Sequence, residues 1–119
     1  MENTLASQLQ QKKAQYAEAW STEQQILHQN VVDKVAATNI TATAKQVGDI
    51  APNFELPNQL GNPSSLQTAM AKGPVVLTWY RGGWCPYCNL SLRALHQKLP
   101  EIEAAGASLI TLTPELPDN

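Results

Sequence analysis

The two cysteines of the chain are the residues best suited to chemistry. Cys85 and Cys88 stand with two residues between them in the stretch "VVLTWYRGGWCPYCNLSLRAL", residues 75–95. A thiolate is a nucleophile, and a second thiol beside it can trap its oxidised form as a disulfide. The residue type and the spacing therefore favour redox chemistry.

The sequence around the cysteines predicts that Cys85 begins a helix. The preceding run "PVVLTWY" is β-branched and aromatic, as in a buried parallel strand. Apolar residues then recur at intervals of three and four, namely Leu92, Leu95, Leu99 and Ile102. Unpaired backbone N–H groups and the positive end of the helix dipole favour a thiolate at such a position. We therefore expect the pKa of Cys85 to be depressed.

The neighbours of Cys85 are candidate activating or substrate-binding residues. Arg81 would add a positive charge in the same turn, and Gly82 and Gly83 would let backbone or substrate approach closely. Trp84 is expected to lie over the site as an apolar lid. Pro86 suits the first helical turn, where its missing N–H would have had no intrahelical acceptor.

Cys88 is predicted to be the partner of Cys85. A CxxC pair at a helix start lies on one helical side with its Cα atoms within disulfide range, and we expect Cys88 to be the less exposed of the two. A zinc site needs about four ligands, and beyond this pair there are only His28 and His96, neither at a matching spacing. We therefore expect no metal or other cofactor. A pair of inert thiols in the core remains an alternative to a redox pair.

Further elements complete a strand, helix, strand unit. Pro100 should kink the helix or split off its last turn, Gly106 should end it, and "ASLITLTP" should form the second strand. Upstream, "IAPNFELPNQLGNPSSL" has three prolines around a Gly61-Asn62 turn, which predicts short edge strands. Ser64 or Ser65 then caps a brief helix.

The N-terminal third is predicted to be helical. Residues 4–37 contain no Gly or Pro, and "STEQ" from Ser21 fits a capping box where a second helix would begin. The apolar stripes of these helices would either pack on the core or form a dimerisation face. "ATNITATAKQVGD" is expected to be a connecting loop. We divide the chain into a helical extension, residues 1–45, and a second part, residues 46–119.

Composition narrows the class of protein. A chain of 119 residues with 43% hydrophobic and 15% charged residues should form one globular domain. A net charge of -2 and no basic block argue against nucleic-acid or anionic-membrane binding. We find no signal peptide and no apolar run long enough to span a bilayer, so the cytoplasm is the expected location. A cysteine pair there is more often reactive or metal-binding than structural.

Two segments carry a resemblance to a known family. "VGDIAPNFELPNQLGNPSSL" and "GPVVLTWYRGGWCPYCNLSLRALHQKLPEIEAAGASLITLTPE" resemble the first half of peroxiredoxin-like proteins of the alkyl hydroperoxide reductase and thiol-specific antioxidant (AhpC/TSA) family. The resemblance implies a thioredoxin-like α/β fold and reduction of hydrogen or alkyl peroxides. It places Cys85 at the peroxidatic position, with Cys88 condensing onto its sulfenic acid and a thioredoxin-like dithiol restoring both. It implies no metal or flavin.

Two other functions stay open. The family pattern has Thr three residues before the reactive cysteine and Pro further upstream, where this chain has Gly82 and Thr78. CPYC is also the glutaredoxin tetrapeptide, so a general thiol-disulfide oxidoreductase acting on a small disulfide is one alternative. A non-catalytic, truncated association module is the other.

The resemblance also implies that part of the fold lies outside this sequence. A thioredoxin-like domain has a further helix and an antiparallel hairpin with a cis-proline loop, so we expect a βαβ half preceded by the helical extension, with the C-terminal half of the fold absent. Two parallel strands leave open edges and cannot cover both apolar faces. We therefore expect a homodimer or another homo-oligomer.

Overall fold

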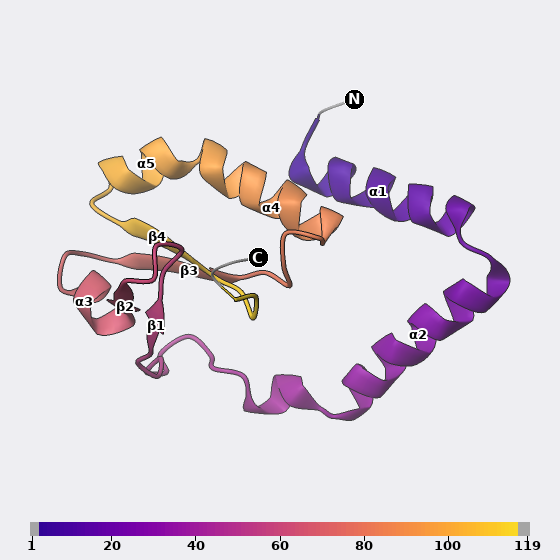
Figure 1. Ribbon diagram of the computed structural model, residues 1–119, viewed down its shortest axis with the longest axis horizontal. Coiled ribbons are helices and arrows are strands. Elements are labelled where there is room, and N and C mark those ends of the chain that lie inside the picture. Colours follow the sequence, from indigo (N-terminus) through magenta and orange to yellow (C-terminus); the bar gives the residue numbers. More distant parts are fainter. Residues whose placement is uncertain (1–2, 117–119) are drawn as a thin grey trace. The chain divides into compact units, whose positions relative to one another are not determined.

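The computed structural model describes residues 3–116 and divides the chain into two compact units. One unit consists of residues 10–52, and the other of residues 53–119 together with the first nine residues. Figure 1 shows the order of the elements along the chain. Each unit is described by itself, and the second contains both cysteines.

The unit of residues 10–52 is helical. It holds most of α1 (Leu5–Ala19), α2 (Thr22–Ala37) and one 3-10 turn, η1 (Ile40–Thr43). The side chain of Ser21 accepts a hydrogen bond from the backbone N–H of Gln24 at 3.2 Å, and the side chain of Gln24 accepts one from the backbone N–H of Ser21 at 2.9 Å. This reciprocal cap confirms the predicted break between two helices. The 3-10 turn lies within the segment expected to be a loop.

The apolar stripe of α2 is not packed in a core. No residue of α2 is buried, and its large apolar side chains keep between 46% and 65% of their surface exposed: Ile26, Leu27, Val31, Val32 and Val35. Within its own helical unit this stripe is not covered, so core packing there, one of the two expectations from the sequence, is not met. An amphipathic pattern predicts which face can be buried, but it does not supply the element that buries it.

A proline-bounded hairpin opens the second unit. Strands β1 (Glu55–Pro57) and β2 (Pro63–Ser65) pair antiparallel, with Pro57 opposite Pro63. The turn between them is held by the Asn58 side chain, which accepts hydrogen bonds from the backbone N–H groups of Leu60 and Asn62. Short strands bounded by proline agree with the prediction. The Ser65 side chain then caps α3 (Leu66–Met70).

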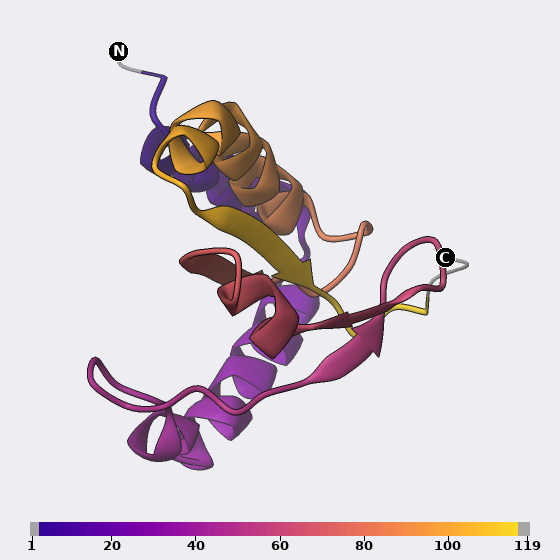
Figure 2. The same ribbon diagram turned by 90° about the vertical axis from the view of Figure 1, so that its left-hand side faces the viewer.

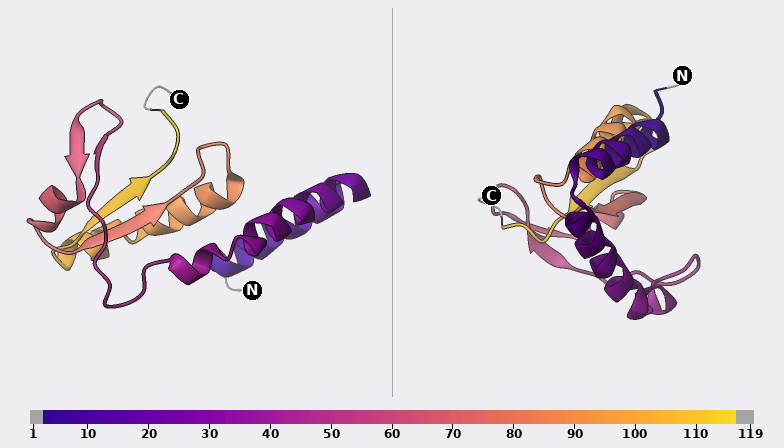
Figure 3. Two further views of the ribbon diagram at one scale, coloured as in Figure 1. Left: turned by 90° about the horizontal axis from the view of Figure 1, so that it is seen from below. Right: turned by 90° about the vertical axis from the view of Figure 1, so that its right-hand side faces the viewer.

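The strand, helix, strand unit forms as predicted. Strands β3 (Val75–Trp79) and β4 (Ser108–Leu112) are parallel, with Val75 opposite Ser108. Between them run α4 (Pro86–Gln97) and α5 (Leu99–Ala104), which Lys98 separates, so Pro100 does split off the last turn of the predicted helix. Figure 3 shows the two strands pointing the same way, with α4 behind them.

Burial in the second unit is lower than expected. The α4 and α5 helices lie to one side of the β3–β4 pair, and α3 and the hairpin lie to the other (Figures 1 and 2). Even so, Val76 and Trp79 keep 37% and 68% of their surface exposed, so the prediction of a buried strand was wrong. A two-stranded sheet has two open edges, and its neighbours cover it only in part. Leu66 and Cys85 are the only apolar side chains buried within residues 3–116.

The helices within residues 3–116 do not have the features of a membrane span. None of them is both long enough and apolar enough to cross a bilayer.

Candidate redox site

Cys85 is the residue that caps α4. Its backbone is extended, with φ -89° and ψ 108°, and its Sγ accepts a hydrogen bond from the backbone N–H of Cys88 at 3.4 Å. Its carbonyl oxygen accepts the first intrahelical bond from Asn89 at 3.0 Å. The sulfur thus occupies the place of the oxygen in a Ser or Asp cap, where a negative charge is favoured. The predicted helix start at Cys85 is confirmed.

Two further donors point at the Cys85 sulfur. The Arg81 Nη2 atom donates to Sγ at 3.5 Å, and the Cys88 thiol donates to it at 2.7 Å. Burial raises the pKa of Cys85, but the hydrogen bonds from the Cys88 thiol, from Arg81 and from the Cys88 backbone, together with the charge of Arg81, lower it. The donors outweigh burial, and the pKa of Cys85 falls to about 7.

The exposure of the two thiols is the reverse of what we expected. Both cysteines are free thiols; Cys85 is only 1% exposed, whereas Cys88 is half-buried. The prediction that Cys88 is the less exposed partner was therefore wrong. The reason is the cap: the Cys85 side chain folds back onto the helix end beneath its donors, while Cys88 lies on the helix wall, where its Sγ accepts from the Arg81 backbone N–H at 3.5 Å.

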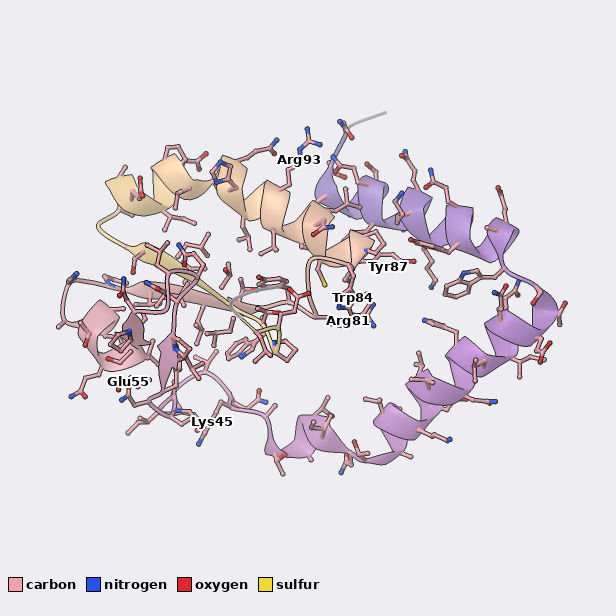
Figure 4. The ribbon with its side chains drawn as sticks, viewed as in Figure 1. Lys45, Glu55, Arg81, Trp84, Tyr87 and Arg93 are labelled. Carbon is pink, nitrogen blue, oxygen red and sulfur yellow. The ribbon has the colours of Figure 1, made fainter. Side chains whose placement is uncertain are left out.

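Arg81 also contacts the aromatic residue next to the pair. The guanidinium carbon of Arg81 lies 4.9 Å from the ring centroid of Trp84, a cation–π distance. Trp84 itself is 66% exposed, and Pro86 follows as the first residue of α4. Figure 4 shows Arg81 and Trp84 side by side where β3 turns into α4, close to Tyr87. Of the sequence-predicted residues, Arg81 and Cys88 contact the Cys85 sulfur, and Trp84 joins the site through Arg81.

The two glycines between Arg81 and Trp84 differ in their surroundings. Gly82 is buried with φ +152°, and a Cβ there would overlap the Trp84 indole and lie 2.6 Å from Oε1 of Glu115. Gly83 has open space where a Cβ would be. Only position 82 therefore requires glycine. The groups that come close to the backbone there are the side chains of Trp84 and Glu115, where we expected backbone or substrate.

Glu115 is a residue of the site that the sequence analysis missed. Its Oε2 accepts a hydrogen bond from the backbone N–H of Gly83 at 3.0 Å, and the carbonyl of Gly83 accepts one from the Asn89 side chain at 2.9 Å. The sequence held a signal for this residue: Glu115 comes just after the predicted strand β4, and the glycine turn comes just after the predicted strand β3. The carboxyl ends of parallel strands meet at one edge, where sites form.

Three charged or titratable residues of α4 and its end lie on the surface. His96, Arg93 and Lys98 are exposed, and Lys98 forms an ion pair with Glu101 at 2.7 Å. Figure 4 shows Arg93 further along α4 than Tyr87. Within residues 3–116 no group of three or more His, Cys, Asp or Glu side chains is gathered as a metal ion would require.

Comparison with known proteins decides the family. The model of the AhpC/TSA family matches residues 47–119, which is more than half of the chain and includes both cysteines. The chain belongs to the AhpC/TSA family. This AhpC/TSA-family match also contains β1 to β4, α3 to α5 and Glu115, whereas α1 and α2 lie outside it.

Two curated relatives of this AhpC/TSA-family chain come from Mycobacterium tuberculosis. Both bear the name "Putative peroxiredoxin", one from strain CDC 1551 / Oshkosh and one from strain H37Rv. Each is 33% identical over 69 residues, which make up 56% of this chain and 45% of the relative. The aligned stretch thus spans less than half the length of either relative. No solved structure gives a significant match.

Proposed function

We propose that Cys85 is the peroxide-reactive residue of a thiol-dependent peroxidase that reduces hydrogen or alkyl peroxides. Family membership supports the reaction class. The observation that carries the proposal is the convergence of three hydrogen-bond donors on the Cys85 sulfur at the amino end of α4, which lowers its pKa to about 7. About half of the sulfur is then ionised at neutral pH, and the thiolate is the form that attacks a peroxide.

The first step of the proposed cycle is the oxidation of Cys85 by the peroxide. The Cys85 thiolate attacks one peroxide oxygen, an S–O bond forms and the O–O bond breaks. The sulfur is oxidised to sulfenic acid, and the peroxide is reduced to an alcohol or water after the leaving oxygen takes up a proton. The Arg81 guanidinium, which contacts both the sulfur and the Trp84 ring, is the nearest cation that would stabilise the leaving oxygen.

The second step uses Cys88. Its sulfur lies 2.7 Å from that of Cys85, so its thiol can attack the sulfenic acid, form a disulfide and release water. A thioredoxin-like dithiol would then reduce that disulfide and return both cysteines to thiols. The partial exposure of Cys88 is consistent with attack by such a reductant at this sulfur.

Rapid mixing of the reduced chain with hydrogen peroxide tests the proposal. With dimedone present, we expect mass spectrometry to find the label on Cys85 in the Cys88→Ser variant and a disulfide in the wild type. The rate should exceed that of free cysteine by at least about a hundredfold, the lower range for a positioned catalytic group. A rate equal to that of free cysteine would rule out the peroxidase.

Thiol-disulfide exchange is the second candidate function. It is favoured by the same short sulfur-to-sulfur distance and by Gly82, which offers no hydroxyl to orient a peroxide. Reduction of a glutathione mixed disulfide that is lost in Cys85→Ser but only altered in Cys88→Ser, together with a slow peroxide reaction, would favour this candidate over the first.

We also propose that the protein self-associates and that it acts in the cytoplasm. The exposed apolar side chains of α2 and the open two-stranded sheet support association, either between copies or with further elements of the family fold. A reducing compartment suits a cycle in which both cysteines must return to thiols. A non-catalytic association module would show the same assembly without any reactivity at Cys85.

A further inference from the structure

The turn that carries Arg81 has an anchor outside its own segment. Residues 81–84 form the middle of the connection between β3 and α4, and the bonds at Gly83 hold this turn from two sides: Glu115 at its N–H and Asn89 at its carbonyl. Asn89 belongs to α4 itself, only six positions along the chain from Gly83. Glu115, after β4, is 32 positions away and is the anchor that ties the turn to the sheet.

Glu115 is itself held in place by Thr113, the residue that follows β4. Its backbone N–H donates to the hydroxyl of Thr113 at 3.3 Å, which fixes the bend after β4. Its two carboxylate oxygens both face the turn, because Oε2 accepts from Gly83 and Oε1 lies 2.6 Å from the point where a Cβ on Gly82 would stand. A side chain at position 82 would displace it.

We infer that Glu115 is a positioning residue for the reactive thiolate: by holding the glycine turn at the end of β4, it keeps the Arg81 guanidinium on the Cys85 sulfur. The inference rests on the thiolate chemistry of the proposed function. Arg81 is separated from the anchored Gly83 by a single buried glycine. A turn released at Gly83 lets the long Arg81 side chain leave the Cys85 sulfur, to which its Nη2 atom donates at 3.5 Å.

The sign of the effect separates positioning from a direct charge effect. A carboxylate acting directly through space would repel the thiolate, so that removing it would lower the pKa of Cys85. A carboxylate acting through the turn does the reverse, because its loss withdraws a hydrogen bond and a positive charge from the sulfur. Two substitutions distinguish the cases: Glu115→Ala removes the acceptor, whereas Glu115→Gln removes the charge but keeps a carbonyl acceptor.

The test is a site-resolved alkylation titration of Cys85 in the full reduced chain. We expect Glu115→Ala to raise the pKa by about one unit, which makes alkylation at pH 7 roughly fivefold slower. Glu115→Gln should leave the pKa at or below the wild-type value. Glu103→Ala, which removes an exposed carboxylate on α5, is the matched control and should not move it.

A third variant keeps the test decisive if Glu115→Ala does not fold. Thr113→Val removes the hydroxyl that holds the Glu115 backbone without touching the turn, and it should raise the pKa in the same direction by a smaller amount. A pKa that falls in both Glu115 variants, or that stays at the wild-type value in Glu115→Ala or in a folded Thr113→Val, overturns the inference. Because alkylation needs no peroxide, a failed peroxidase assay with a low pKa at Cys85 would count against the proposed function alone.

Discussion

At the scale of single residues, the sulfur of Cys85 is both the cap of α4 and the candidate nucleophile. A cap normally uses an oxygen to satisfy a free N–H group, and here the Cys88 N–H donates to sulfur instead. The same geometry that caps the start of α4 therefore stabilises the charge that the proposed reaction needs. Burial to 1% exposure works against that charge, so the donors decide whether the site is reactive.

The pH dependence of Cys85 reactivity follows from its depressed pKa. An acid whose pKa is lowered by folding is ionised above that lower value, so the alkylation rate should rise with a midpoint at about pH 7. By linkage, the associated stability is fully present above the pKa of an unfolded cysteine and is lost as the pH falls through about 7. Iodoacetamide labelling resolved by peptide mass measures the midpoint, and a midpoint of about 8.5, as in free cysteine, would contradict the site geometry.

Arg81 can be tested against an arginine of the same segment. Arg81→Gln removes a hydrogen bond and a positive charge from the sulfur, so the pKa of Cys85 should rise by about one unit. Arg93→Gln removes an exposed guanidinium from α4 and should leave the alkylation midpoint unchanged. Equal midpoints in the two variants would show that Arg81 does not act on the thiolate.

At the scale of elements, the junction between β3 and α4 sets the site. The strand ends at Trp79, the turn brings Arg81 back over the helix start, and Cys85 begins the helix. This order was predictable because each step has a local signal: a β-branched run, two glycines and then a proline in the first helical turn. Which glycine is indispensable was not predictable, because that depends on side chains from other segments.

The two glycines form a matched pair for testing the turn. Gly82→Ala should destabilise the chain by about 1–3 kcal/mol and slow the reaction of Cys85, because its φ of +152° and the contacts with Trp84 and Glu115 leave no place for a Cβ. Gly83→Ala adds the same methyl group to open space and should have a small effect. Chemical denaturation monitored by circular dichroism measures both, and an equal loss of stability would contradict this account.

At the scale of the whole molecule, the described residues bury little apolar surface. Leu66 and Cys85 are the only apolar side chains that they bury. A domain is stabilised mainly by the apolar area removed from water, so exposed side chains such as Val31 and Trp79 point to surfaces that association would cover. Within these residues the core is smaller than the sequence led us to expect for a globular domain.

Self-association through α2 is the prediction at this scale. Sedimentation velocity should show a species larger than the monomer at low micromolar concentration. Val31→Glu should weaken association by about tenfold, because burying a valine contributes about 1.5 kcal/mol. Asn30→Glu places the same charge at the adjacent exposed position and should have a smaller effect. A compact, stable monomer in the wild type would contradict the prediction.

The sequence alone determined the features that depend on near neighbours. The break at Ser21, the proline-bounded hairpin, the split before Pro100 and the start of α4 at Cys85 all follow from short spacings, because a helix cap or a missing N–H acts within one turn. The candidate pair Cys85 and Cys88 was identified in the same way.

The tertiary structure decided what depends on contacts between distant segments. It placed Glu115 on the N–H of Gly83, 32 positions away, and it buried Cys85 while leaving Cys88 partly exposed. It also left β3 only partly covered, where the pattern predicted burial, and the apolar side chains of α2 exposed, where the pattern allowed for burial. The physical reason is that a pattern of apolar residues or a CxxC spacing specifies the local backbone, whereas exposure and long-range hydrogen bonds exist only once particular strands have paired and their carboxyl ends have met.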